Sequence, residues 1–329
     1  MKRFTKVIAL KVASATGKMI TFLLNHDVFL KIYNKVYESS PHLLVRQYVK
    51  FIELPEKNRI WLIKLENGKV VKTYLKRGDL KSKQFALSYK WHSPSLNFTE
   101  KILSEYYHLN VPWIDIGSNL GLRSLIALSE NRPVYFLEPN TELNAINRER
   151  CELNNFQNTT FIEAGVSDKK GIAKFYIDST SYNSSLDERI SGTNRIKEEV
   201  MIQTGTLDHL FRDKLNDYET ACIKMDVEGH ELHALKGAEE VINKWEPTMM
   251  IEVNMSSGNH EAFLNFVKKW DYEVYQIKKF SSSNYYKKIT VSTEPFIDDL
   301  ESNDFLLLKD QSLKKIIDKY AVSVPKIKN

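Results

Sequence analysis

The sequence predicts an α/β fold in which a mostly parallel sheet, with an antiparallel edge strand, is flanked by helices and preceded by a helical and β-hairpin extension. Short apolar runs typical of strands alternate with segments of helical period between residues 111 and 308. The first run, Trp113–Ile116, leads through a glycine turn into a pattern with Leu122, Leu125 and Ile126 at helical spacing. Polar side chains follow several runs, and the carboxyl ends of parallel strands meet in one crevice.

Composition places the chain among globular proteins. Of its 329 residues, 42% are hydrophobic and 27% are charged, which excludes a disordered or fibrous protein. No run of about 18 apolar residues occurs, so no membrane-spanning helix is expected. Cys151 and Cys222 are too few for a disulfide framework and lack metal-ligand spacing. We therefore expect two thiols in a reducing cytoplasm.

Positive charge gathers at the N-terminus. Residues 1–50 carry nine Lys or Arg and two Asp or Glu side chains, a net charge of +7, whereas the whole chain carries +5. A nucleic-acid-binding core would hold the basic excess itself, so nucleic acid is not expected as a partner. Helix-spaced apolar residues such as Phe4, Ile8 and Met19 predict a basic amphipathic helix over residues 1–37. It is expected to pack on the main domain, to contact an anionic membrane surface, or to join two copies of the chain.

A hairpin and a helix are expected between this segment and the glycine turn. Two strand-like runs, Ile60–Leu65 and Lys69–Leu75, flank an Asn-Gly pair, which is a strong short hairpin signal. A helix over Thr99–Tyr107 follows, with Thr99 as the expected N-cap. The chain then divides into a basic helical extension (1–50), the hairpin with its lead-in helix (51–110), the α/β domain (111–308) and a basic peripheral tail (309–329).

The glycine turn is the first stretch that carries chemistry. Its sequence is D-x-G-x-N-x-G, with Asp115 at the end of the strand and glycines at 117 and 121. Glycines let backbone N–H groups come close to a ligand. Asn119 stands where a dinucleotide fingerprint has its second glycine, so we expect a nucleoside without a pyrophosphate.

The next two strands add expected contacts to that nucleoside. Glu138 ends the strand Val134–Leu137, and a carboxylate there can accept both hydroxyls of a ribose. A helix over Thr141–Leu153 is expected after it. The third strand ends in Ala164, a small residue against which an adenine ring could lie flat. The polar stretch 178–199 is expected to be a lid or binding loop, or else a solvated insertion.

A second informative stretch runs from Ala221 to Ala238. A strand ends near Asp226, and a turn with Glu228 and His230 leads into a helix. The strand Met249–Val253 follows, with Glu252 and Asn254 at its end. The last strands, Glu273–Ile277 and Asp304–Leu308, are expected to pair antiparallel at the sheet edge.

These stretches together resemble the FkbM family of S-adenosylmethionine-dependent methyltransferases. The resemblance rests on W-I-D-I-G-S-N-L-G, F-L-E-P-N, G-T-L-D-H-L and I-K-M-D-V-E-G-H-E-L-H-A-L-K-G-A, and it covers about Val111–Leu308. It implies a Rossmann-like, seven-stranded methyltransferase fold and O-methylation of a hydroxyl. The acceptors that it implies are sugars of surface glycans or related natural products. The two isolated thiols fit a cytoplasmic enzyme, and the basic N-terminus suggests a place at the inner face of the membrane.

The resemblance and the pattern together assign site residues. Glu252 and Asn254 are expected to bind the acceptor. The cofactor S-adenosylmethionine is expected at Asp115, Gly117, Ser118, Asn119, Gly121, Glu138, Ala164 and Asp226.

A hydroxyl nucleophile must lose its proton, so a general base is expected. His230 is the first candidate, because a helix N-terminus keeps an imidazole neutral, and Glu228 is the second. No bound metal is expected, although Asp226, Glu252 and Asn254 could instead hold Mg²⁺ and activate the hydroxyl.

Two other classes of function stay open at this level. One is an oxidoreductase with a nucleotide cofactor, which Asn119 in place of a glycine argues against. The other is an inactive binding module recruited to membranes by its N-terminus, which the intact Asp115, Gly117, Glu138 and Asp226 argue against.

Overall fold

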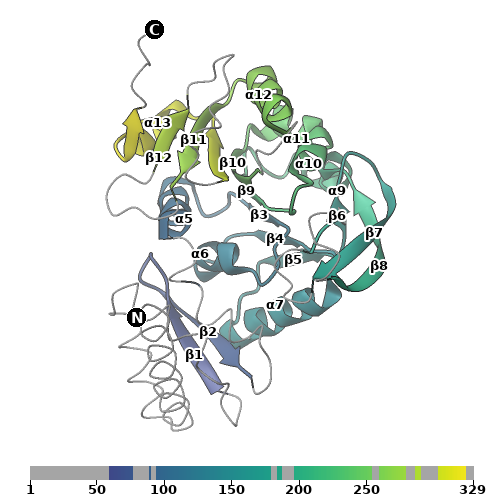
Figure 1. Cartoon of the computed structure of the whole chain (residues 1–329). Coiled ribbons are helices and arrows are strands. Elements are labelled where there is room, and N and C mark those ends of the chain that lie inside the picture. The colour runs from purple at the N-terminus through teal and green to yellow at the C-terminus, as the bar shows by residue number, and fades with distance from the viewer. Residues whose placement is uncertain are drawn as a thin grey trace, which may run out of the picture. The chain divides into compact units, whose positions relative to one another are not determined.

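The computed structural model describes residues 59–76, 89, 94–178, 184–186, 196–253, 259–278, 286–289 and 303–323 (Figure 1). They fall into two compact units, divided before Pro94 except that Glu152–Asn155 group with the first unit. The expected N-terminal helix over residues 1–37 lies outside the described residues.

The described part of the first unit is a β-hairpin. Strands β1 (Arg59–Lys64) and β2 (Val70–Leu75) pair antiparallel, as the Asn-Gly signal predicts. The turn needs a glycine, because Gly68 has a φ of 83°, in the left-handed region. Side chains alternate along both strands, so that Trp61 is buried whereas Leu62 is exposed.

The second unit is built on a nine-stranded sheet with the order β14-β12-β11-β13-β10-β9-β3-β4-β5. The five strands from β10 to β5 are parallel, and β13 is antiparallel to both of its neighbours. The predicted mostly parallel sheet with antiparallel strands towards one edge is therefore confirmed. Two short strands extend it beyond the expected edge. In chain order the strands are β3 (Trp113–Ile116), β4 (Val134–Leu137), β5 (Thr159–Ile162), β9 (Cys222–Met225), β10 (Thr248–Glu252), β11 (Glu273–Ile277), β12 (Tyr286–Ile289), β13 (Asp304–Leu308) and β14 (Ala321–Ser323).

Helices cover both faces of the sheet. In Figure 1, α6 and α7 lie on one side of β3–β5, and α9, α10 and α11 lie on the other. On the second side the inward residues of the strands form one buried apolar cluster with Leu235, Ile242 and Trp245. The helices are α5 (Pro94–Tyr106), η1 (Leu122–Ser124), α6 (Leu125–Ser129), α7 (Thr141–Asn154), α9 (Leu207–Leu210), η2 (Arg212–Lys214), α10 (Glu231–Lys236), α11 (Glu239–Trp245), α12 (Asn259–Trp270) and α13 (Gln311–Asp318). Among the described helices, none combines the length and the apolar character needed to cross a bilayer.

A three-stranded sheet is inserted between β5 and β9. It consists of β6 (Gly165–Val166), β7 (Gly171–Asp178) and β8 (Ile196–Gly205), in the order β6-β8-β7. Strand β7 ends at Asp178 and β8 begins at Ile196, so β8 contains the last residues of the expected loop 178–199. Between the two strands, the structure describes only residues 184–186. The lid role of that loop stays a prediction.

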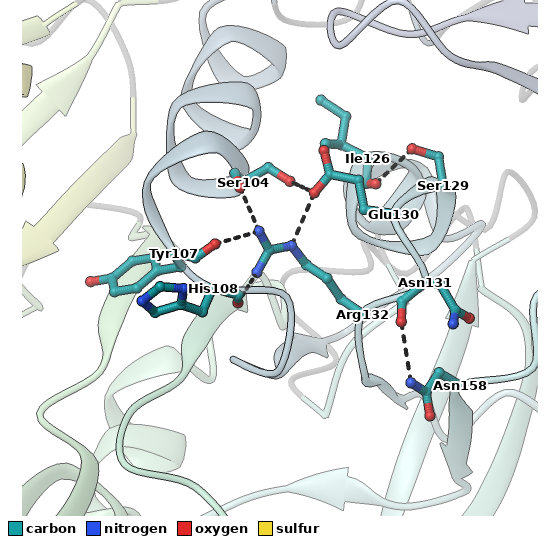
Figure 2. Close-up of polar contacts among 9 residues, drawn as sticks. All are labelled: Ser104, Tyr107, His108, Ile126, Ser129, Glu130, Asn131, Arg132 and Asn158. Atoms are coloured by element: carbon teal, nitrogen blue, oxygen red, sulfur yellow. Dashed lines mark hydrogen bonds and ion pairs between the residues drawn. The ribbon is translucent and has the colours of Figure 1, made fainter.

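Helix α5 begins five residues before the expected start. Proline is favoured in the first turn of a helix, and Pro94 opens this one. Thr99 therefore lies inside the helix, where its hydroxyl donates to the Ser95 carbonyl at 2.8 Å instead of capping the end. Figure 2 shows how Arg132 holds the other end, donating to the carbonyls of Ser104, Tyr107 (2.7 Å) and His108 (2.6 Å).

The segment after Lys309, expected as a peripheral tail, forms α13 and β14. Asp310 caps α13 by accepting from the backbone of Ser312 (2.8 Å) and Leu313 (3.1 Å). Leu313 and Ile317 are fully buried. Their four-residue spacing puts both on one face of the helix, so the basic composition of the segment hides an apolar stripe.

Candidate functional site

Polar residues form a row along the carboxyl edge of the parallel strands. The register of β4, β3 and β9 places Glu138, Gly117 and Asp226 side by side, each directly after its strand. On β10, Glu252 pairs with Asp304 of the antiparallel β13. The structure therefore brings together the predicted Gly117, Glu138, Asp226 and Glu252, and it adds Asp304. The predicted Asn254 lies outside the residues that the structure describes.

The two glycines of the turn are required by the protein's own packing. At Gly117, with a φ of 68°, a Cβ atom would lie 1.9 Å from the backbone oxygen of Asp226. At Gly121, also with a φ of 68°, it would lie 2.9 Å from Asn147 Oδ1. Sequence reasoning ascribed both glycines to the close approach of a ligand. The close approach that the structure shows is that of β9 and α7 to the turn.

Glu138 and Asn119 link the second strand to the turn. Asn119 has a φ of 48°, in the left-handed region that asparagine tolerates better than most residues. Its N–H donates to Glu138 Oε2, and the N–H of Asn140 donates to Glu138 Oε1, both at 2.9 Å. Burial raises the pKa of Glu138 to about 7. Each carboxylate oxygen keeps a lone pair for a further donor.

Two buried polar atoms beside Glu138 lack a hydrogen-bond partner within the described part of the chain. They are Ser118 Oγ, in the glycine turn, and Asn140 Nδ2, and both residues are about 95% buried. An unsatisfied buried polar atom costs about 1–3 kcal/mol, so such atoms point to a missing partner. Ser118 is one of the predicted cofactor residues. Asn140 was missed, although it directly follows the Glu-Pro pair.

Asp115 faces the interior. Its Oδ2 accepts from Ser124 Oγ at 2.6 Å, and its Oδ1 lies 3.5 Å from Lys224 Nζ. Lys224 also donates to the Gly117 carbonyl at 3.0 Å and lies 3.4 Å from Asp226 Oδ2. This buried lysine therefore ties β3 to β9 beneath the turn. Sequence reasoning missed it, and the only signal was a cation inside the apolar run I-K-M.

Carboxyl groups crowd the other end of the row. Burial, with the nearby charge of Asp226 as the next cause, raises the pKa of Glu228 to about 8. The charge of Asp226 is the main cause that raises the pKa of Glu252 to about 9, even though the Glu252 side chain is exposed. Lys224 opposes both shifts. The arrangement can hold a proton at neutral pH, which is what a general base needs after it has acted.

The turn that carries Glu228 is shaped by Glu231. Its Oε1 accepts from the backbone N–H groups of Val227 and Gly229, both at 3.0 Å. Glu228 itself has a φ of 51°, in the left-handed region, and its carbonyl accepts from Ser185 Oγ at 2.8 Å. A bulky residue in this conformation is uncommon, and such residues cluster at functional sites.

His230 contacts a different set of residues. Its Nε2 lies 2.9 Å from Ser167 Oγ, and its ring stacks on His233 with a centroid distance of 4.5 Å. His233 Nδ1 in turn lies 3.2 Å from Asp168 Oδ2. His230 thus interacts with the loop between β6 and β7, and its role as a base stays a prediction. The predicted Ala164 is buried directly before β6.

In the described part of the chain, no three or more His, Cys, Asp and Glu side chains are grouped so that they could hold a metal ion. The magnesium set that the sequence suggests includes Asn254, so it reaches beyond these residues.

Comparison with known proteins gives one family match. Residues 115–274 match the model of the methyltransferase FkbM domain. No curated relative matches the chain significantly. A solved FkbM methyltransferase from Methylobacillus flagellatus is 17% identical with a TM-score of 0.38, and the match covers 70% of this chain and 55% of that chain. A putative methyltransferase from Streptococcus mutans, solved with SAH, is 14% identical with a TM-score of 0.35, over 65% of this chain and 95% of that chain. The present chain thus spans about half the length of the Methylobacillus protein.

Proposed function

We propose that the chain, whose residues 115–274 match the methyltransferase FkbM domain, transfers a methyl group from S-adenosylmethionine to a hydroxyl. The observation that carries the proposal is the row at the strand ends, where Glu138 stands beside the glycine turn and two unsatisfied polar atoms. As acceptor we propose a sugar of a surface glycan or a related natural product, which is the class that the family resemblance implies.

The residues around the turn fit a nucleoside cofactor. The Glu138 carboxylate can accept from ribose hydroxyls with the lone pairs that its two backbone bonds leave. Ser118 Oγ and Asn140 Nδ2 offer further polar groups that a ligand would satisfy. When bound, S-adenosylmethionine supplies an electrophilic methyl group. Asp115 and Lys224, which lie beneath the turn, support its shape without facing the ligand.

We assign the base to Glu228 rather than to His230. Glu228 lies two residues after Asp226 in the turn that follows β9, and burial and the charge of Asp226 are the two largest causes that raise its pKa. Its carboxylate would take the proton of the acceptor hydroxyl and hold it, because a pKa of about 8 matches that task near neutral pH. His230 is the second candidate, and its Nε2 would first have to leave Ser167.

Glu252 and Asp304 are the proposed acceptor contacts. The two carboxyls lie opposite each other across β10 and β13, one strand away from Asp226. Carboxylates accept hydrogen bonds from hydroxyls, so a polyhydroxylated acceptor suits them. Asn254 stays a predicted contact. Magnesium held by Asp226, Glu252 and Asn254 is the alternative way to activate the hydroxyl.

Binding measurements test the proposal directly. Isothermal titration calorimetry of the full chain should show saturable binding of S-adenosylmethionine and of S-adenosylhomocysteine, and no comparable binding of NAD. Tight NAD binding would instead favour the oxidoreductase, and the absence of all binding would favour an inactive module. Transfer of radiolabelled methyl groups to a panel of mono- and oligosaccharides then tests the acceptor. Loss of transfer in EDTA, with recovery in Mg²⁺, would establish the metal route.

We also propose that the basic N-terminal segment, which the sequence predicts to be helical, brings the enzyme to the cytoplasmic face of an anionic membrane. The support is the net charge of +7 over residues 1–50 and their helix-spaced apolar residues. Co-sedimentation with phosphatidylserine vesicles should fall as salt rises and should be lost when residues 1–37 are removed. If the truncated protein still sediments, the membrane contact lies elsewhere. Dimerisation that depends on the same residues would favour a contact between two copies.

A further inference from the structure

We propose that Asn147 and Arg150 of α7 are positioning residues that hold the glycine turn in the conformation that receives the cofactor. The inference rests on the proposed function, because it concerns how the turn is kept ready for S-adenosylmethionine. Both side chains are buried, with exposed fractions of 0% and 4%. Polar side chains that are this deeply buried nearly always form hydrogen bonds within the protein.

The two side chains bind successive carbonyl groups of the turn. Asn147 Nδ2 donates to the Asn119 carbonyl at 2.8 Å, and Arg150 Nη1 donates to the Leu120 carbonyl at 2.7 Å. The N–H and C=O of a trans peptide point in opposite directions. When Asn147 binds the Asn119 carbonyl, the N–H of Leu120 therefore points away from α7. The helix thus fixes the orientation of two peptide groups in the turn.

This fixing matters because the turn passes twice through the left-handed region. Asn119 has a φ of 48° and Gly121 a φ of 68°. Such residues can adopt other backbone conformations at small cost, glycine above all. In the observed conformation the Asn119 N–H donates to Glu138 Oε2 at 2.9 Å, and the Asn119 carbonyl accepts from Asn147. The N–H that holds the carboxylate proposed to bind the ribose therefore lies in the peptide group directly before the two that α7 fixes.

Asn147 and Arg150 are oriented by each other. Arg150 Nη1 donates to Asn147 Oδ1 at 2.8 Å, so the amide must turn its NH₂ group towards Asn119. With an exposed fraction of 4%, the Arg150 guanidinium is shielded from water, and this burial lowers its pKa to about 9. Hydrogen bonds strengthen where water is excluded. Gly121 completes the fit, because any Cβ there would press on Asn147 Oδ1.

The sharpest test is Asn147→Asp. A carboxylate has the same shape and can still accept from Arg150, so the fold should survive with a melting temperature within a few degrees of the wild type. It cannot donate to the Asn119 carbonyl, and it repels that oxygen. We expect the dissociation constant for S-adenosylmethionine, measured by calorimetry well below the melting temperature, to rise at least tenfold. A value within twofold of the wild type in the folded variant would overturn the inference.

Arg150→Lys gives a second variant in case Asn147→Asp does not fold. Lysine keeps the positive charge, but its side chain is one bond shorter, so its ammonium group does not reach the position from which Nη1 donates to the Leu120 carbonyl and to Asn147 Oδ1. The dissociation constant should therefore rise at least fivefold. An unchanged value here would also overturn the inference. The matched control is Arg148→Met on the same helix, because Arg148 is half exposed and lies 3.4 Å from Glu163 on the surface. Its binding should match that of the wild type, and weakened binding in the control would mean that any loss of α7 charge has this effect.

Hydrogen exchange of the ligand-free protein separates this inference from the proposed function. The Gly121 amide closes the turn by donating to the Ser118 carbonyl at 2.7 Å. Its exchange should speed up at least tenfold in Asn147→Asp, whereas the amides of β4 should keep their rates. This result is expected even if the wild type binds a different nucleoside. Equal exchange of Gly121 in both proteins would overturn the positioning role, whatever the cofactor.

Discussion

The two ends of the polar row are built on opposite principles. At the cofactor end, backbone N–H groups satisfy both oxygens of Glu138, and side chains of α7 hold the carbonyls of the turn. At the acceptor end, the charge of Asp226 helps to raise the pKa of both Glu228 and Glu252. The cofactor end is therefore a preorganised binding site, which we call the cradle. At the acceptor end the carboxylates repel one another, and a ligand or a proton relieves that repulsion. Binding calls for rigidity, whereas taking up a proton calls for a carboxylate whose charged form is destabilised.

The largest effect is expected from Gly117→Ala, because Gly117 makes the closest backbone contact of the cofactor-binding turn. The new methyl group would lie 1.9 Å from a backbone oxygen of Asp226, in a left-handed conformation that alanine resists. Because backbone cannot move aside as a side chain can, β3 and β9 must separate. We expect loss of S-adenosylmethionine binding and a fall of several kcal/mol in the free energy of unfolding, measured by urea titration.

The control for that variant is Gly68→Ala in the hairpin. Gly68 has a similar positive φ of 83°, but no atom lies within 4 Å of its added Cβ. Its cost should stay near that of backbone strain alone, about 1 kcal/mol. Equal losses in the two variants would show that φ, and not the contact with Asp226, makes Gly117 necessary.

The next largest effect is expected at the acceptor end, from Glu228→Gln. Loss of general base catalysis typically lowers the rate by about 10²- to 10⁴-fold. The amide keeps the size of the side chain, so the affinity for S-adenosylmethionine should change little. The rate of methyl transfer should rise with pH in the wild type as a group with a pKa of about 8 loses its proton, and this dependence should vanish in the variant.

His230→Asn is the competing variant in the same assay. If His230 is the base, this variant loses the rate instead, and the pH dependence of the wild type should vanish in it. If Glu228 is the base, His230→Asn should keep most of its turnover, because His230 contacts Ser167 and His233, which are not part of the polar row at the strand ends. The comparison of the two variants therefore decides between the residues in one experiment.

A smaller effect is expected at the cradle from Glu138→Gln. The amide loses the charge that strengthens hydrogen bonds from ribose hydroxyls, so binding of S-adenosylmethionine should weaken by about 1–3 kcal/mol. The pKa of Glu138 in the free protein is raised to about 7, and the carboxylate is the form that accepts from two hydroxyls. Affinity in the wild type should therefore fall as pH is lowered through 7, whereas the variant should lack this dependence. Calorimetry between pH 6 and pH 8.5 measures both.

Sequence reasoning found the residues of this row where they are neighbours along the chain. The runs around Asp115 and Asp226 could be located because a strand, a turn and a helix follow one another within a few residues. It missed the residues whose role depends on distant contacts. Lys224 differs in sequence from an exposed strand residue only in its two apolar neighbours, and Asp304 reaches Glu252 only through the antiparallel register of β13. Asn147 lies on a helix that was predicted, but its partner in the turn is 28 residues away.

For the two glycines of the turn, the sequence indicates that a Cβ atom is excluded but does not reveal which residues exclude it. Gly117 and Gly121 were singled out for their absent Cβ atoms, and the structure confirms that a Cβ would clash at each. The clash, however, is with Asp226 and Asn147, which no local pattern reveals. The tail after Lys309 shows the same limit, because its many lysines outweigh Leu313 and Ile317 in any average of composition although these two are fully buried.

The smallest expected effect is on stability, and it sharpens the contrast between the two ends. The pKa of Glu228 is about 8 in the folded protein and near 4.5 when exposed, so between these values the folded state binds more protons than the unfolded state. Stability must then fall as pH rises through this window. Glu228→Gln removes the group that causes this fall. The ligand-free variant should therefore be more stable than the wild type at pH 9, by on the order of 1–2 kcal/mol, and equal to it near pH 4.5. The urea midpoints of both proteins at these two pH values test this directly. If the variant is no more stable than the wild type at pH 9, solvent already screens the repulsion between the carboxylates at the acceptor end, and this repulsion does not destabilise the fold.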